Sequence, residues 1–537
     1  MSFTKKRTFF ASLLWMLSAS DHAYAFSLWP IFRMATLTKP RIAKSKKQTR
    51  VDANTAVVSK VATKRPPETS KAPIAAPIVA PICDDDDDEC WQDAVYGISH
   101  HHFIAENAVA QETPTTTTAT ETVSLVQSLW EPVSHGPPDA ILGIAQAFAA
   151  CTDPRKVSVC VGAYRDEHGQ PWVLPSVRAA ERQLLRQNEP KEYLPIEGDT
   201  AFVQQALKFA YGSNVDLSKI AGVQTLSGTG ACRIGGHFLA RQLPATTPIY
   251  IPVPTWGNHW NIFQECGLLT KPYRYYNRAS NRLDLEGMLL DISKAPDGSV
   301  ILLHACAHNP TGCDPTMDEW KEILLVMERK KHIAFFDSAY QGFASGDAER
   351  DAAAFRYVVE QGKVPVLLAQ SFAKNFGLYG DRCGTLSVVC GNAEQKERIL
   401  SQLRLTIRPM YSSPPRQGSS IVRTVLSHPK LSRQYYKECK HMADRIHATR
   451  TKLVATLAQV GSQHDWSHIT NQIGMFAFTG MSPEMCDQLT NDYAIYLTRD
   501  GRISIAGLND SNLEYVAQAI HAVTHGRSIT EEITTPQ

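Results

Sequence analysis

From about Ser124 onward, short runs of apolar residues alternate along the chain with longer amphipathic stretches. Such runs predict buried strands, and the amphipathic stretches between them predict helices. The alternation therefore indicates an α/β protein with a largely parallel sheet. The strands that matter most are predicted at 223–226, 248–253, 301–303, 333–336 and 364–369. Because ligands of such sheets bind beyond the carboxyl ends of the strands, we expect the residues after these runs to meet in one crevice.

The first 25 residues have the pattern of a secretory signal peptide. Basic residues at positions 5–7 precede an apolar run from Thr8 to Leu17, and Ala23-Tyr24-Ala25 supplies small residues at a cleavage point. The run is shorter than the roughly 20 residues that a membrane-spanning helix needs, and no later uninterrupted run reaches that length. We therefore predict no membrane association.

Residues 26–82 are basic, and only Asp52 and Glu68 carry negative charge there. This composition is typical of organelle transit peptides. The signal peptide, Phe26 at the junction and the transit-like segment resemble the bipartite presequences of algae whose plastids lie inside the endomembrane system. We predict plastid import, with the secretory pathway, a mitochondrion or a plain basic tail as the alternatives.

Residues 83–123 combine a run of acidic residues, Asp84–Asp88, with His100–His102 and a Thr-rich patch. Such a segment has too little apolar surface to fold alone, so we predict a linker. The acidic run beside the histidines could hold a divalent cation, but a solvated charge run is the simpler interpretation. Pairing of Cys83 with Cys90 stays open.

The whole chain of 537 residues has 55 basic and 53 acidic residues, which argues against a nucleic-acid binder with a strongly basic surface. Ten of its twelve cysteines are scattered from Cys151 to Cys486, mostly inside apolar runs, and this favours buried free thiols over a disulfide scaffold. Neither a CxxC pair nor an HExxH motif occurs, so we predict no metal site.

Candidate chemistry follows the predicted strands. Ser227-Gly228-Thr229-Gly230 lies between a strand and a predicted helix at 231–241, where free backbone N–H groups suit a phosphate. Lys374 and Asp337 each come just past another strand, with Tyr340 three residues beyond Asp337 and Trp256 on a neighbouring tail. Pyridoxal 5′-phosphate requires this combination: a lysine for its aldehyde, a carboxylate for its ring nitrogen and an aromatic ring to stack on it.

The motifs extend this picture to a known family. Residues 371–379 (SFAKNFGLY), followed by Arg382 and Gly384, resemble the lysine motif of class I aminotransferases, specifically of the aspartate aminotransferases. Further matching segments are 161–165 (VGAYR), 193–196 (YLPI), 227–230 (SGTG), 256–259 (WGNH), 309–312 (NPTG), 337–343 (DSAYQGF), 412–415 (SSPP) and 501–503 (GRI). They run in family order over roughly 124–525.

The resemblance implies a role for each site residue. Lys374 would hold the cofactor and shuttle the substrate proton, and Asp337 would hold the ring nitrogen. Tyr340 and Asn309 would bond the phenolate oxygen of the cofactor, and Trp256 would stack on its ring. The implied phosphate ligands are Ser227, Gly228, Thr229, Ser371 and Arg382, together with Tyr193 from a second subunit. A homodimer with shared active sites is therefore expected.

The resemblance also implies how the substrate is held. Arg502 would clamp the α-carboxylate, and Arg408 of the other subunit would bind the distal carboxylate, with Gly162 also at the substrate. The chain departs from the family at Ser413, where Asn is usual, and at Tyr411, where Trp is common. These departures leave the arginine in place but affect the expected shape of the distal pocket.

The expected fold is that of fold-type I pyridoxal-phosphate enzymes: a large domain with a mostly parallel, seven-stranded type of sheet flanked by helices, plus a smaller α/β domain. We predict an arm and the first part of the small domain at 124–172, the large domain at 173–442 and the rest of the small domain at 443–530. Closure of the small domain would seal the crevice on dicarboxylate binding.

The expected reaction is ping-pong transamination of L-aspartate and 2-oxoglutarate to oxaloacetate and L-glutamate. The alternatives are an aminotransferase that also accepts aromatic amino acids, an aspartate β-decarboxylase, and a non-catalytic binding protein.

Overall fold

The computed structural model describes residues 129–136 and 142–527, which all belong to one compact unit of the chain. The predicted signal peptide, transit-like segment and linker at 1–123 lie outside the described residues. No helix in the described part is long and apolar enough to cross a membrane.

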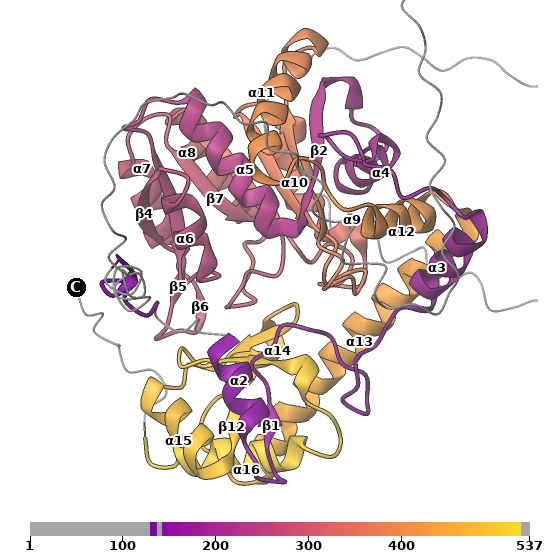
Figure 1. Ribbon diagram of the computed structural model, residues 1–537. Coiled ribbons are helices and arrows are strands. Elements are labelled where there is room, and N and C mark those ends of the chain that lie inside the picture. Colours follow the sequence, from indigo (N-terminus) through magenta and orange to yellow (C-terminus); the bar gives the residue numbers. More distant parts are fainter. Residues whose placement is uncertain (1–128, 137–141, 528–537) are drawn as a thin grey trace, which may run out of the picture. The chain divides into compact units, whose positions relative to one another are not determined.

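A seven-stranded sheet forms the centre of the fold (Figure 1). Its strands, in spatial order, are β2 (Ile220–Leu226), β10 (Cys383–Val389), β9 (Val366–Ser371), β8 (Ile333–Ser338), β7 (Val300–His304), β3 (Pro248–Val253) and β4 (Leu269–Arg274). All neighbours pair in parallel except β10, which runs antiparallel to both β2 and β9. The predicted α/β class with a mostly parallel seven-stranded sheet is therefore confirmed.

The sheet is buried on both faces, which explains why its central strands are continuous apolar runs. Leu302, Phe335 and Leu367 point to one face, where they pack with α5 (Ser227–Gln242), α6 (Asn258–Gln264) and α11 (Ala393–Tyr411). Their neighbours Leu303, Phe336 and Leu368 point to the other face. That face is covered by α4 (Thr200–Tyr211), α7 (Leu285–Lys294), α8 (Met317–Arg329), α10 (Ala353–Gln361) and α12 (Arg416–Ser427).

Local sequence explains where several of these helices begin. Asp199 accepts hydrogen bonds from the backbone N–H groups of Ala201 and Phe202 at the start of α4. Thr316 and Glu319 form a capping box at the start of α8. These caps satisfy N–H groups that would otherwise lack partners in the first helical turn.

A smaller body combines segments from both ends of the described chain. Strand β1 (Val157–Ser158) pairs in parallel with β12 (Ile495–Tyr496), and β11 (Phe476–Phe478) pairs antiparallel with β13 (Arg502–Ser504). The helices α2 (Leu142–Ala150), α14 (Ser467–Asn471), α15 (Pro483–Tyr493) and α16 (Leu513–Thr524) surround these pairs (Figure 1). The two small sheets bring residues near Gly162 and Arg502 into one body.

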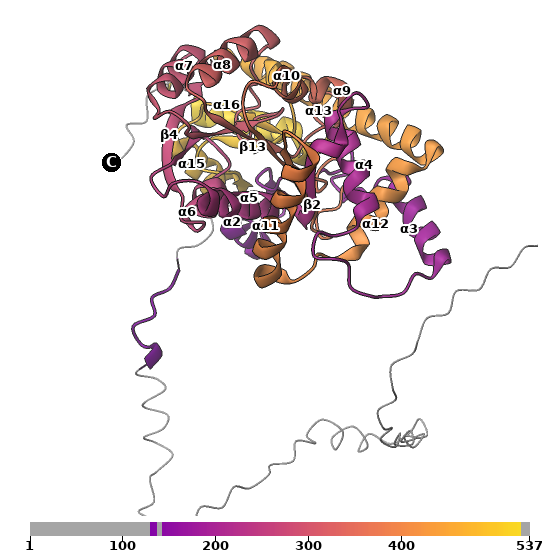
Figure 2. The same cartoon turned by 90° about the horizontal axis from the view of Figure 1, so that it is seen from above.

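One long helix, α13 (Pro429–Gln459), joins the two bodies (Figure 1), which overlap when seen from above (Figure 2). In its first half, Glu438 accepts hydrogen bonds from Ser176 of α3 (Pro175–Gln187). In its second half, Arg450 donates to the carbonyl of Ile469 in α14. The helix passes the predicted domain border at residue 442 without a break, and that border stays a prediction.

The cysteines agree with the prediction of buried thiols. None of the ten in the described part forms a disulfide, and all but Cys151 and Cys313 are buried.

Candidate active site

The predicted crevice exists as a cavity of about 230 Å³ at the carboxyl ends of the parallel strands. It brings together residues from segments more than 200 positions apart. The predicted residues that line it are Gly162, Ser227, Gly228, Thr229, Trp256, Asn309, Asp337, Tyr340, Ser371, Lys374 and Arg382. The strand-end argument from the sequence therefore located the cavity.

One end of the cavity is built from hydroxyl groups, a guanidinium group and a helix N-terminus. The side-chain oxygens of Ser227 and Ser371 lie 2.9 Å apart, and the backbone N–H of Ser227 donates to the carbonyl of Arg382 at 3.0 Å. A Cβ atom on Gly228 would lie only 3.2 Å from the Cβ of Ser371. Since α5 begins at Ser227, its free N–H groups open toward the same end, which suits an anion such as phosphate.

Asp337 lies near the end of β8, where its Oδ1 would be 3.9 Å from a Cβ atom on Gly228. Its Oδ2 is 3.2 Å from Nε2 of His259, and Nδ1 of His259 is 2.8 Å from the hydroxyl of Thr255. Burial opposes ionisation of Asp337, but its hydrogen bond to His259 and the electrostatic effects of His259, His304 and Lys374 together hold the pKa of the carboxyl below its usual value. Asp337 is thus a partly buried carboxylate that faces the cavity.

Lys374 follows β9 in the turn that begins at Phe372. Its Nζ lies 5.5 Å from the ring centre of Tyr340. Burial lowers the pKa of Lys374; Asp337 opposes this shift, whereas Arg382 and Arg502 add to it. Burial also raises the pKa of Tyr340, so its hydroxyl stays protonated and able to donate.

Arg502 lies beside the cavity rather than among its lining residues. It is buried, and it donates through Nη1 to Oδ1 of Asn309 at 3.4 Å and through Nη2 to the carbonyl of Cys160 at 3.1 Å. Its Nε has no hydrogen-bond partner among the described residues. Asn309 lines the cavity, so Arg502 places a positive charge at this corner, where a carboxylate could bind.

Two predicted residues lie elsewhere. Tyr193 is 89% exposed, and Arg408 is exposed on α11, where its Nη1 donates to the hydroxyl of Ser412. Neither side chain lines the cavity of its own chain.

The sequence prediction missed several residues at the cavity. His304, Cys306 and Tyr379 line it, and His259 contacts Asp337 from behind. His304 and Cys306 follow β7, so the strand-end rule could have found them. The hydroxyl of Tyr379 accepts a hydrogen bond from the backbone N–H of Tyr164 at 2.8 Å, which ties the lysine loop to the segment carrying Gly162.

The donor set of the cavity fits pyridoxal 5′-phosphate. Hydroxyl groups, N–H groups and Arg382 at one end suit its phosphate, and the Lys374 amine suits its aldehyde. The partly buried Asp337 carboxylate suits a protonated ring nitrogen. All of these residues already line the cavity, so the cofactor would need no rearrangement of the backbone to bind.

The fold and the cavity define an enzyme of the pyridoxal-phosphate type, and comparisons with known proteins place it more narrowly. The family described as "Aminotransferase class I and II" matches residues 154–520. The mitochondrial aspartate aminotransferase of Gallus gallus is 49% identical over 400 residues, which cover 74% of this chain and 94% of that protein. The chain belongs to the class I and II aminotransferases, and its cofactor is pyridoxal 5′-phosphate.

Solved structures agree with this assignment. A mitochondrial aspartate aminotransferase from Trypanosoma brucei matches with a TM-score of 0.68 and 45% identity, covering 71% of this chain and all of that one. An aromatic-amino-acid aminotransferase from Burkholderia pseudomallei, covalently bound to pyridoxal phosphate, matches with a TM-score of 0.71 and 38% identity, covering 74% and 99%. The solved structures that resemble this chain therefore include both an aspartate aminotransferase and an aromatic-amino-acid aminotransferase.

Proposed function

We propose that this enzyme is an aspartate aminotransferase, which transfers the amino group of L-aspartate to 2-oxoglutarate and yields oxaloacetate and L-glutamate. The observation that carries the proposal is the convergence of Lys374, Asp337 and the phosphate-binding end in one cavity, with Arg502 at its corner. The 49% identity to an aspartate aminotransferase over nearly the whole length of that protein supports the choice of substrate.

When bound, pyridoxal 5′-phosphate supplies an electron sink for negative charge at the substrate Cα. Asp337 would accept a hydrogen bond from the protonated ring nitrogen, and its hydrogen bond to His259 helps to keep it ionised. Ser227, Gly228, Thr229, Ser371 and Arg382 hold the phosphate.

Tyr340, Asn309 and Trp256 line the cavity; the first two would donate to the phenolate oxygen of the cofactor, and Trp256 would stack on its ring. Lys374 would hold the cofactor through its amine and would serve as the base that moves the proton of the substrate Cα. A lysine can act as a general base only when its amine is partly neutral. Burial of Lys374 and the nearby arginines lower its pKa, which increases the fraction of neutral amine.

Arg502 binds the α-carboxylate, since its guanidinium is buried, retains an unpartnered Nε and lies next to Asn309. Gly162 leaves room for the substrate beside it. Arg408 of a second subunit binds the distal carboxylate, and Tyr193 of that subunit reaches the phosphate. The exposure of Arg408 and Tyr193 in the single chain is consistent with such a homodimer.

A hybrid dimer tests the shared site directly. A Lys374→Ala homodimer should be nearly inactive toward aspartate, and an Arg408→Ala homodimer should keep at most about a tenth of the unaltered efficiency. In a mixed dimer, the Arg408→Ala chain keeps its lysine and receives Arg408 from the Lys374→Ala chain, so one site is complete. Activity should therefore return on co-refolding. If the mixture stays as inactive as its parents, Arg408 does not act across a subunit interface.

Substrate choice is tested by comparing aspartate with phenylalanine. Loss of the charged pair in Arg408→Ala should lower kcat/KM for aspartate by roughly 10- to 150-fold and leave phenylalanine nearly unaffected. Efficient turnover of phenylalanine by the unaltered enzyme would instead assign a broader aminotransferase, as the altered residues Tyr411 and Ser413 allow. Formation of alanine and carbon dioxide from aspartate would assign a β-decarboxylase.

The N-terminal residues outside the family match, up to about Val123, serve in this proposal to direct the enzyme to an organelle. The names of the chicken and trypanosome relatives favour a mitochondrion. The signal-like and transit-like pattern of the sequence favours a plastid. A fluorescent fusion of residues 1–123 distinguishes the two, and a fusion retained in the cytosol would contradict both.

A further inference from the structure

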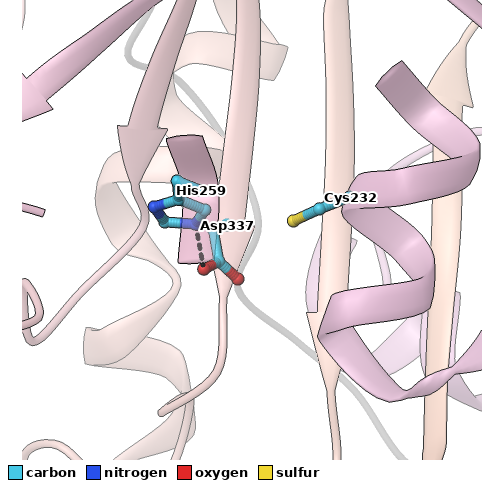
Figure 3. Close-up of side chains that lie close together, drawn as sticks. All are labelled: Cys232, His259 and Asp337. Atoms are coloured by element: carbon cyan, nitrogen blue, oxygen red, sulfur yellow. Dashed lines mark hydrogen bonds and ion pairs between the residues drawn. The ribbon is translucent and has the colours of Figure 1, made fainter. Parts of the chain in front are cut away.

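Behind the cofactor cavity lies a cluster of three side chains that can each bind a metal ion. The Sγ of Cys232 on α5, the imidazole of His259 on α6 and the carboxylate of Asp337 on β8 all lie within 4.8 Å of one another (Figure 3). In the close-up, the Cys232 thiol points across from its helix toward the His259–Asp337 pair. The described residues contain no other such group of three.

The spacing of the cluster is close to that of a tetrahedral zinc site. Ligand bonds of about 2.0–2.3 Å at tetrahedral angles separate the ligand atoms by about 3.3–3.6 Å. Nε2 of His259 and Oδ2 of Asp337 are already 3.2 Å apart. The thiol needs to approach the pair by at most roughly 1.2 Å, because no separation in the cluster exceeds 4.8 Å.

The surroundings also resemble those of a metal-binding histidine. Such a residue usually has its second ring nitrogen fixed by a polar group, which orients the ring. Here the hydroxyl of Thr255 lies 2.8 Å from Nδ1 of His259. A hydroxyl can accept or donate, so Thr255 suits the tautomer in which Nε2 is free to bind the ion.

The set of one thiol, one imidazole and one carboxylate selects Zn²⁺ over Mg²⁺ or Ca²⁺, which prefer oxygen ligands. Entry is possible because Asp337 lines the cavity, whereas Cys232 and His259 are buried behind it. The fourth coordination position then opens toward the cavity and can hold a water molecule.

We propose that the enzyme without its cofactor binds one Zn²⁺ per chain through Cys232, His259 and Asp337, and that this ion prevents uptake of pyridoxal 5′-phosphate. On binding, the Cys232 thiol releases its proton to water, and the proton of His259 resides on Nδ1. The exclusion of the cofactor rests on the proposed role of Asp337 at the ring nitrogen, whereas zinc binding itself does not. Since the ligands come from three elements that are 27 and 78 residues apart, no contiguous motif could have predicted this site.

The first experiment measures binding of Zn²⁺ to the full-length chain after removal of the cofactor. Unaltered protein and a Cys390→Ala control, which removes another buried thiol, should bind one more ion per chain than Cys232→Ala does. Residues 83–123 are identical in all three proteins, so any ion bound there cancels. Loss of the thiol should weaken binding at the site by more than about 100-fold, beyond the effect of losing a residue that only orients a ligand. Equal binding by all three proteins overturns the site.

The second experiment identifies the ligand and the competition. Co²⁺ in place of Zn²⁺ should give a sulfur-to-cobalt charge-transfer band in the unaltered protein and in Cys390→Ala but not in Cys232→Ala. Zinc added first should block the return of the cofactor's visible absorbance in the unaltered protein, and Cys232→Ala should regain that absorbance with or without zinc. Uptake of the cofactor by the zinc-loaded protein overturns the exclusion. Absence of aspartate turnover in the zinc-free holoenzyme would overturn the proposed function and leave zinc binding intact.

Discussion

The guanidinium carbon of Arg502 lies 4.1 Å from the ring centre of Phe476. The two residues belong to the paired strands β13 and β11, where Phe476 is in register with Ser504. The same ring lies so close to Gly162 that a Cβ there would come within 2.7 Å of its Cζ atom. Phe476 therefore supports both the proposed α-carboxylate ligand and the segment beside it.

Replacing Phe476 with Leu should weaken substrate binding more than turnover. The leucine keeps the position apolar but removes the cation–π contact, which contributes about 0.5–2 kcal/mol. We expect the KM for aspartate to rise about 2- to 30-fold with a smaller change in kcat. Phe355→Leu is the matched control, since that buried ring packs against Tyr211 and Phe336. An equal rise in both variants would contradict a specific role for Phe476.

Gly162→Ala should damage activity through the same ring. The added methyl group must displace the Phe476 ring, because 2.7 Å is well inside van der Waals contact. We expect kcat/KM for aspartate to fall at least about tenfold, with partial recovery in the double variant Gly162→Ala, Phe476→Leu. Strictly additive losses in steady-state kinetics would show that the two positions act independently.

Arg450 should be needed both for stability and for the position of Phe476. It is almost fully buried and donates to the carbonyls of Ile469 at 2.9 Å, Gly474 at 2.8 Å and Phe476. Arg450→Met leaves these carbonyls without a donor, at a cost of about 1–3 kcal/mol each. We expect chemical denaturation to show a loss of at least about 3 kcal/mol, together with a raised KM for aspartate.

The control for Arg450→Met lies on the same helix. Lys452 is exposed and forms an ion pair with Asp510, so Lys452→Met should cost at most about 1 kcal/mol. Similar losses in the two variants would contradict the support by Arg450.

The stability of Asp351→Asn relative to the unaltered protein should increase as pH rises. Burial raises the pKa of Asp351 to about 6, although it accepts hydrogen bonds from the backbone of Gly342 and Ser345. A carboxyl whose pKa is higher in the folded state favours folding while it is protonated, and this contribution is lost as pH rises toward 6 and above.

Asparagine stays neutral throughout, so the advantage of Asp351→Asn should grow by about 1–2 kcal/mol between about pH 5 and about pH 7.5. Unfolding midpoints of both proteins across this range provide the measurement. A stability difference that is constant with pH, or that shrinks as pH rises, is the contrary result.

The strands could be predicted from the sequence because each one is a short, continuous run of apolar residues. The runs predicted at 248–253 and 333–336 correspond to β3 and β8, and their polar tails do line the cavity. The helix predicted at 231–241 begins earlier, at Ser227, where a positive φ of 61° turns the chain directly from β2 into α5. Apolar periodicity carries no signal for such a turn.

The pattern of apolar and polar residues does not predict contacts between segments that are far apart in the sequence. Arg502 meets Asn309 across 193 positions, and His259 meets Asp337 across 78. Arg382 reaches the cavity because β10 runs antiparallel, so that its first residues lie where the parallel strands end. Only the family resemblance pointed to Arg382 and Arg502, because their placement depends on the tertiary fold.

Helix α13 is a rigid connection between the two bodies of the molecule. Its 31 residues form a rod of about 46 Å that is bonded to Ser176 in its first half and to Ile469 and Asp510 in its second half. A tilt of about 5° at its base would carry its tip through about 4 Å, with the backbone hydrogen bonds of the helix intact. Arg450 of this helix bonds the carbonyls of Ile469 and Gly474 in the smaller body, so such a tilt would displace that body without unwinding the helix.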